Sequence, residues 1–176
     1  MQIASGTTGF LAGIIVTSIF LMDPQHDFNS AEAELVPTIQ YGSANVNDLE
    51  WLAKTIYFEA RGESTANMTA VGLVIMNRMK KDDRTVQQVV TQGKQDRSGK
   101  MIRNKCQFSF YCDGKSDEPK DAAAYERAKV VAQGILEGRT FDFTDGATHY
   151  HADYVKTNWG MSKVTKIDRH IFYRSN

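Results

Sequence analysis

Two glutamates, Glu59 and Glu63, stand where the apolar face of a helix would continue. The residues before them, Leu49, Leu52 and Ile56, recur at steps of three and four, which is the spacing of a helix face turned toward a core. A carboxylate on such a face is costly to desolvate unless it is paired, protonated or in use. Because burial raises the pKa of a carboxyl group, the pattern indicates a general acid.

Three further residues with metal-ligating side chains lie near the C-terminal end. His149, His151 and Asp153 occupy alternate positions, so on a strand all three would point to one face, and His170 is a fourth candidate. Three such ligands can bind zinc and activate water. Polar or structural histidines give the same short pattern, so it favours a metal site only weakly.

The chain has two cysteines, Cys106 and Cys112, which enclose the five residues QFSFY. In an exported protein we expect a disulfide within this loop, whereas in a cytosolic protein we would expect two free thiols. A zinc pair fits poorly because its two ligands are usually separated by two to four residues.

The elements that must position these residues can be read from periodicity and capping signals. Ser64 can cap a helix, Pro119 suits a first helical position, and Gly138 suits a helix end. Asn77 or Arg78 is expected to tie the second helix to the turn after Glu59. The expected elements are a helix at 47–61, a helix at 65–80, a short helix after Thr85, a long loop at 92–117, a helix at 119–136, and strands at 147–154 and 163–174.

Length and charge limit the remaining possibilities. The chain has 176 residues, of which 41% are hydrophobic, enough for one globular domain. All 21 Lys and Arg residues follow residue 50, whereas six of the 21 acidic residues lie within 1–50. The later part therefore carries six excess positive charges, which suits a polyanionic partner or simply gives a solvated basic surface.

Residues 1–22 contain no charged side chain, and the 20 residues from Ile3 to Met22 would span roughly 30 Å as a helix. We interpret 1–22 as a membrane anchor that is uncleaved or inefficiently released, rather than as a cleaved signal peptide, although Ala31-Glu32-Ala33 resembles a cleavage site. Residues 23–46 are interpreted as a linker and 47–176 as the catalytic domain. Either kind of N-terminal segment would export the domain and face it toward the cell wall.

Five strings together resemble the SleB/CwlJ-type cell wall hydrolases, the family of the spore cortex-lytic enzymes. They are LAKTIYFEARGE, IMNRM, CQFSFYCDG, ATHYHADYVKTNW and HIFYR, and they cover roughly residues 47–174. The resemblance implies an α+β fold, a mostly helical domain similar to lysozymes and lytic transglycosylases with a small antiparallel sheet. It also implies cleavage of the peptidoglycan backbone between N-acetylmuramic acid and N-acetylglucosamine.

For individual residues, the resemblance implies that Glu59 is the catalytic acid, with no metal or other cofactor and with no nucleic acid as partner. A lytic transglycosylase needs one carboxylate, whereas a muramidase would use a second, for which Glu63, Asp113 and Asp117 are available. Substrate-binding residues are expected along the groove, namely Glu63, Gln107, Phe108, Ser109, Tyr111, His149, Tyr150, His151 and Asn158.

Two alternatives stay open at this point. One is a zinc-dependent peptidoglycan amidase or peptidase that uses His149, His151 and Asp153. The other is a wall-binding module without catalytic activity, against which the intact EARGE string argues. The sequence leaves open whether the chain is a phage endolysin or a bacterial remodelling enzyme, and it leaves the oligomeric state open.

Overall fold

The apolar stripe before Glu59 forms helix α1, Val46–Ala60, in the computed structural model, which describes residues 45–175. The Asn45 side chain caps its first turn, and Leu52 and Ile56 are fully buried. The helix ends before Gly62, so Glu63 does not continue its apolar face. Of the two glutamates on the expected stripe, only Glu59 therefore belongs to the helix.

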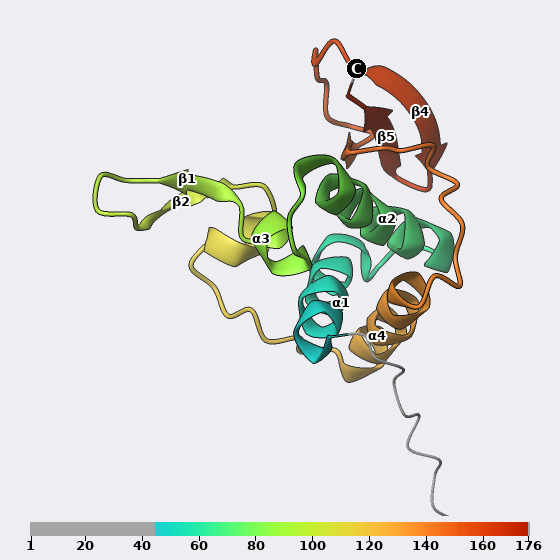
Figure 1. Ribbon diagram of the computed structural model, residues 1–176, viewed down its shortest axis with the longest axis horizontal. Helices are drawn as coiled ribbons and strands as arrows, with labels where there is room; N and C mark the ends of the chain where they lie inside the picture. The colour runs from blue at the N-terminus through green and yellow to red at the C-terminus, as the bar shows by residue number, and fades with distance from the viewer. Residues whose placement is uncertain (1–44, 176) are drawn as a thin grey trace, which may run out of the picture. The chain divides into compact units, whose positions relative to one another are not determined.

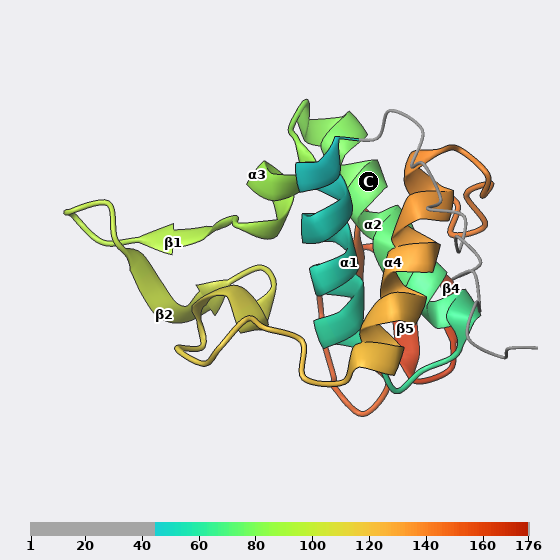
Figure 2. The same cartoon turned by 90° about the horizontal axis from the view of Figure 1, so that it is seen from below.

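Two of the other three helices lie at the predicted positions, whereas the last begins at Ala122, so the prediction of Pro119 at its first position was wrong. Helix α2 is Thr65–Asp82, α3 is Val86–Val90 and α4 is Ala122–Leu136, and the side chains of Ser64, Thr85 and Asp121 cap them. Helix α1 packs against the other three (Figures 1 and 2). A Cβ atom on Gly72 would lie only 2.5 Å from Ile135 and 3.0 Å from Ile56, so glycine permits the close approach of α1, α2 and α4.

The expected long loop at 92–117 was wrong in part, because it contains a hairpin. Strand β1, Gly93–Gln95, pairs antiparallel with β2, Met101–Cys106, and a short 3-10 helix, η1, follows at Ser109–Cys112. The hairpin extends away from the helices in both views (Figures 1 and 2). Most of its residues are exposed, so they carry no alternating apolar pattern that would predict a strand.

The C-terminal region forms a three-stranded antiparallel sheet rather than two strands. Its strands are β3, His149–Ala152, β4, Ser162–Ile167, and β5, His170–Arg174, in the order β3-β5-β4. The expected strand at 163–174 is divided by a turn at Asp168, whose φ of 46° lies in the left-handed region.

The fold class is the expected one, mixed α and β, mostly helical, with small antiparallel sheets. The expected anchor at 1–22 and nearly all of the linker at 23–46 lie outside the described residues. Within residues 45–175, no helix is both long enough and apolar enough to span a membrane.

Candidate active site

A pocket of about 460 Å³ contains the carboxyl group of Glu59. It is built by the end of α1, the segment between the two cysteines, and strand β3 with the loop that follows it. The residues that line it are Phe58, Glu59, Arg78, Gln107, Phe108, Ser109, His149, Tyr150, His151, Ala152, Tyr154, Trp159 and His170. Glu59 is the one carboxylate among these described lining residues.

Glu59 is hydrogen-bonded to Tyr150, which lies 91 residues later in the chain. The Tyr150 hydroxyl donates a hydrogen bond of 3.0 Å to Oε2 of Glu59. Burial raises the pKa of Glu59, and the hydrogen bond from Tyr150 opposes part of that rise. Burial and the neighbouring Glu59 charge raise the pKa of Tyr150 well above its ordinary value, so its hydroxyl stays a donor.

Strand pairing and ring contacts hold Tyr150 in this position. Tyr150 lies opposite Phe172 in the register of β3 with β5, and the two ring centroids are 5.7 Å apart. The His170 ring lies 5.1 Å from Tyr150 on the same sheet. Since Phe172 is fully buried, the Tyr150 ring is anchored to the core while its hydroxyl reaches Glu59.

Arg78 connects α2 to both walls of the pocket. Its Nε donates to the Thr148 carbonyl at 2.6 Å, and its Nη1 donates to Oε1 of Gln107 at 3.3 Å. The guanidinium also lies over the Phe108 ring, 5.6 Å from its centroid. Burial lowers the pKa of Arg78 from its high ordinary value. The expected tie to the turn after Glu59 is therefore wrong, because Arg78 binds the residue before β3 and the cysteine loop instead.

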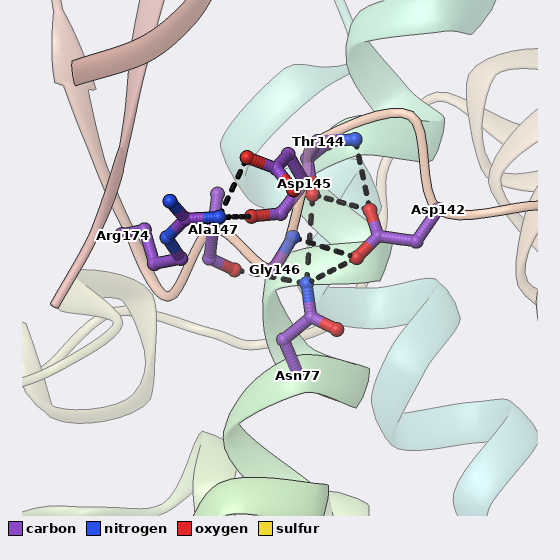
Figure 3. Close-up of polar contacts among 7 residues, drawn as sticks. All are labelled: Asn77, Asp142, Thr144, Asp145, Gly146, Ala147 and Arg174. Atoms are coloured by element: carbon purple, nitrogen blue, oxygen red, sulfur yellow. Dashed lines mark hydrogen bonds and ion pairs between the residues drawn. The ribbon is translucent and has the colours of Figure 1, made fainter. Parts of the chain in front are cut away.

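Asn77 anchors the chain that leads into β3 (Figure 3). Its amide donates to Asp142 at 2.9 Å and to the Ala147 carbonyl at 3.1 Å. The Asp142 carboxylate also accepts from the backbone N–H groups of Thr144 and Gly146, at 2.8 and 3.0 Å. This network fixes the segment that leads into Tyr150 against helix α2.

The predicted disulfide between Cys106 and Cys112 is present, with their Cα atoms 6.1 Å apart. It closes a loop that contains the pocket residues Gln107, Phe108 and Ser109. In the same loop, the Phe110 ring stacks on Phe58 at 4.8 Å, and Tyr111 turns away to contact Trp51. The disulfide thus confines one wall of the pocket.

The histidines of β3 line the pocket but do not form a metal centre with Asp153. Nε2 of His151 lies 3.0 Å from the Tyr173 hydroxyl, and Asp153 forms an ion pair with Lys166 at 2.8 Å. Burial lowers the pKa of His149. Within the part of the chain that the structure describes, no group of three or more His, Cys, Asp or Glu side chains could hold a metal ion.

The structure brings most predicted site residues together and leaves three apart. Gln107, Phe108, Ser109, His149, Tyr150 and His151 line the pocket with Glu59, whereas Glu63, Tyr111 and Asn158 do not. Six lining residues were not named as groove residues from the sequence, namely Phe58, Arg78, Ala152, Tyr154, Trp159 and His170. Trp159 is 42% exposed at the rim, and a tryptophan in a polar loop beside Asn158 was the available signal.

Asp113 and Asp117 line a different pocket of about 310 Å³. Phe58 contributes to both pockets, so the two are neighbours. The carboxylates available for a two-carboxylate mechanism therefore do not line the pocket that contains Glu59.

Comparisons with known proteins found a matching family, a related sequence and two related structures. The profile of a family described as cell wall hydrolase matches residues 62–173, well over half of the chain. The matched range begins three residues after Glu59.

A spore cortex-lytic enzyme of Halalkalibacterium halodurans is 26% identical over 152 residues. The alignment covers 85% of this chain and 41% of that relative, so the chain spans less than half of the relative's length.

Two solved structures share the fold. The catalytic domain of the Bacillus cereus SleB protein is 25% identical, with a TM-score of 0.53, and the match covers 76% of this chain and 94% of that domain. The catalytic domain of the germination-specific lytic transglycosylase SleB from Bacillus anthracis is also 25% identical. Its TM-score is 0.51, and the match covers 76% of this chain and 98% of that domain.

Proposed function

The chain belongs to the cell wall hydrolase family, and from this premise we propose that it is a lytic transglycosylase that cleaves the peptidoglycan backbone with Glu59 as its acid. One observation carries the proposal. A single carboxyl group, whose pKa burial raises, lies in a pocket lined by aromatic and polar side chains and accepts a hydrogen bond from Tyr150. Aromatic faces and polar edges suit a sugar chain.

In the first step, protonated Glu59 donates its proton to the glycosidic oxygen between N-acetylmuramic acid and N-acetylglucosamine. The bond from the anomeric carbon to that oxygen breaks, and Glu59 becomes a carboxylate. The Tyr150 hydroxyl then stabilises this carboxylate by the hydrogen bond that it already donates. In the second step, Glu59 takes the proton from the C6 hydroxyl of the muramic acid, whose oxygen bonds to the anomeric carbon.

The composition of the pocket favours this route over hydrolysis. A hydrolytic muramidase uses two carboxylates that flank the scissile bond. Among the described residues that line the pocket, Glu59 is the one carboxylate, while Asp113 and Asp117 line the neighbouring pocket. The intramolecular attack by the C6 hydroxyl needs no second carboxylate, so the available groups are sufficient for it.

The test is mass spectrometry of the soluble products after the full chain digests purified peptidoglycan. We expect anhydromuramic ends from the wild type and at least a hundredfold fewer from Glu59→Gln, because general acid catalysis typically contributes about 10²–10⁴-fold. Glu63→Gln is the matched control, since it makes the same chemical change outside the pocket. Reducing ends would indicate a hydrolase, and cleaved amides would indicate the alternative that uses His149, His151 and Asp153.

We also propose that the catalytic domain acts outside the cytoplasm, attached to the membrane by residues 1–22. The support is the substrate class of the family and the uncharged run that ends at Met22. Fractionation of cells that express the full chain tests the attachment. Recovery of the intact chain in the soluble fraction would contradict it.

A further inference from the structure

The pocket of about 310 Å³ beside the active site has a mixed lining that the proposed reaction does not use. Its apolar floor consists of Tyr57, Phe58 and Phe110. Since Phe58 also lines the pocket that contains Glu59, a ligand could extend from one pocket into the other. The rest of the wall comes from Arg61 and the loop at 113–120.

The loop that closes this pocket is held against the end of α1. The Tyr57 hydroxyl accepts two backbone N–H groups, from Lys120 and Asp121, each at 3.1 Å. The Asp113 carboxylate accepts the backbone N–H of Lys115 at 2.7 Å. Because backbone groups make these bonds, the pocket wall is already formed without a ligand.

Two cations at this pocket are not neutralised by the protein. The Arg61 guanidinium lies over the Tyr57 ring, 5.1 Å from its centroid. Within residues 45–175, no carboxylate forms an ion pair with Arg61 or Lys120. A ligand carboxylate could therefore bind either cation without displacing an existing partner, and Arg61 could bind it with two parallel hydrogen bonds.

The opposite charge is concentrated in the same pocket. Asp113, Asp117 and Glu118 all line it. Asp113 forms an ion pair with Lys115 at 3.8 Å and Glu118 forms one with Lys54 at 3.5 Å, whereas within residues 45–175 Asp117 forms none. Burial first, and then the neighbouring Asp113 charge, raise the pKa of Asp117, although Lys54 opposes the rise. Such crowding of carboxylates would be relieved by a ligand cation, so the pocket favours an ammonium group near Asp117.

A short peptide carries both a carboxylate and an ammonium group on a partly apolar backbone, so it fits this lining. Neutral sugar rings would leave Arg61, Lys120 and Asp117 without a charged partner, and a polyanion would be repelled by the three carboxylates. We propose that this pocket binds the stem peptide of the muramic acid at the cleavage site, with a peptide carboxylate at Arg61 and Lys120 and its amino group at Asp117. This assignment rests on the proposed function, because it makes peptide-bearing glycan the preferred substrate of the same active site.

The test compares two substrates with the full chain. One is intact peptidoglycan, and the other is the same glycan after an amidase has removed its stem peptides. We expect kcat/KM to be about tenfold higher on the peptide-bearing glycan, a factor equivalent to about 1.4 kcal/mol. Equal kcat/KM on the two substrates would overturn the subsite.

Variants test which residues cause the preference for peptide-bearing glycan. The double variant Arg61→Gln, Lys120→Gln is expected to lose the preference through a higher KM on the peptide-bearing glycan, with unchanged cleavage of the stripped glycan. The control Arg97→Gln, Lys163→Gln removes the same charge from residues that line neither pocket. It should keep the wild-type ratio of kcat/KM on peptide-bearing glycan to kcat/KM on stripped glycan. If the double variant Arg61→Gln, Lys120→Gln keeps the wild-type preference for peptide-bearing glycan, the proposed peptide subsite is wrong.

A second variant covers the case in which the double variant fails to fold. Asp117→Asn keeps the shape of the side chain and should lower the preference for peptides that have a free amino group, but not for peptides whose amino group is acetylated. An equal effect on both peptides would overturn the assignment of Asp117. The proposed function is tested separately, because anhydromuramic ends on stripped glycan that Glu59→Gln abolishes would support it whatever the preference.

Discussion

In the proposed mechanism Glu59 acts first as an acid and then as a base, and its pairing with Tyr150 suits both requirements. Burial raises the pKa of Glu59, which favours the protonated form that donates. The hydrogen bond from Tyr150 lowers that pKa, which favours the carboxylate left after donation. Because Tyr150 stays protonated at neutral pH, it can stabilise the charged state without exchanging its own proton.

Replacing Tyr150 by phenylalanine should separate these two effects. The pKa of Glu59 should rise further, so the alkaline limb of the pH–rate profile should move to higher pH. At the same time kcat should fall roughly tenfold to a hundredfold, because a hydrogen bond to a charged group contributes about 1.5–3 kcal/mol. The measurement is kcat against pH, from the release of anhydromuramic products.

Tyr154→Phe is the matched control, since Tyr154 lines the same pocket but does not donate to Glu59. Its profile should keep the wild-type alkaline limb. If the alkaline limb moves to lower pH or stays in place in Tyr150→Phe, the hydrogen bond does not lower the pKa of Glu59.

The sequence predicted individual site residues better than it predicted their partners. Glu59 was identified because a carboxylate interrupts an apolar stripe, which is a local pattern. Its bond to Tyr150 depends on how β3 pairs with β5 and packs against α1, and no local pattern encodes a contact across 91 residues. Glu63 was placed on the same stripe because it lies four residues after Glu59, but α1 ends at Ala60 and its period does not continue to Glu63.

At the level of elements, helices were predicted well because their capping residues and the spacing of their apolar residues can be read within one short segment of sequence. Ser64 caps the helix for which it was proposed, and a short helix begins after Thr85 as predicted. The hairpin of β1 and β2 was missed because most of its residues are exposed and therefore need no apolar alternation. The turn between β4 and β5 was missed because it contains no glycine or proline, and Asp168 adopts the left-handed conformation instead.

The disulfide should affect both stability and activity, because it confines the wall that contains Gln107, Phe108 and Ser109. Reduction should lower the free energy of unfolding by about 2 kcal/mol, the value expected for closing a short loop. It should also lower activity on peptidoglycan, since the pocket wall would become mobile. The measurements are thermal unfolding and product release, with and without a thiol reductant.

The double variant Cys106→Ser, Cys112→Ser controls for other effects of the reductant. It should resemble the reduced wild type and should not respond to reductant. Full activity of wild-type protein whose thiols are shown to be free by mass spectrometry would contradict the role of the disulfide.

Asp142 should stabilise the segment that leads into β3 by an amount that depends on pH. Partial burial alone would raise the pKa of Asp142, but hydrogen bonds, chiefly from Thr144 and Asn77, hold it below its ordinary value. A lowered pKa means that this stabilisation is present above the ordinary carboxyl pKa and is lost as the pH falls through the lowered one. Asp142→Asn should therefore cost about 1–2 kcal/mol in the free energy of unfolding at neutral pH, because an NH₂ group cannot accept these bonds.

The difference between Asp142→Asn and the wild type should shrink in acid, as followed by urea unfolding at a series of pH values. Asp145→Asn is the control, because Asp145 forms an exposed ion pair with Arg174, which contributes about 0–1 kcal/mol. A difference for Asp142→Asn that is independent of pH would show that the charge of Asp142 does not stabilise this segment.

For the whole molecule, the candidate active site is built where separate parts of one core meet. Helix α1 is packed against α2, α3 and α4, and it carries Glu59 at its C-terminal end. The opposite wall is β3, which is held by β5 and by the contacts of Asn77 and Arg78 on α2. A partly buried carboxyl group in such a frame should lower global stability, because ionised Glu59 is desolvated by the fold.

Glu59→Gln should therefore unfold at a higher temperature than the wild type at neutral pH, by a few degrees. The sign follows from the raised pKa of Glu59. The folded protein binds the proton more tightly than the unfolded chain, so the wild type loses stability as the pH rises from the ordinary carboxyl pKa to the raised one, and no more above it. Glutamine stays neutral and keeps an acceptor for Tyr150, so the variant avoids that loss.

Below the ordinary carboxyl pKa the two proteins should unfold at the same temperature, as followed by calorimetry from acid to neutral pH. Equal unfolding temperatures at neutral pH would mean that Glu59 ionises in the folded protein without cost, and it would then lack the raised pKa that an acid catalyst needs.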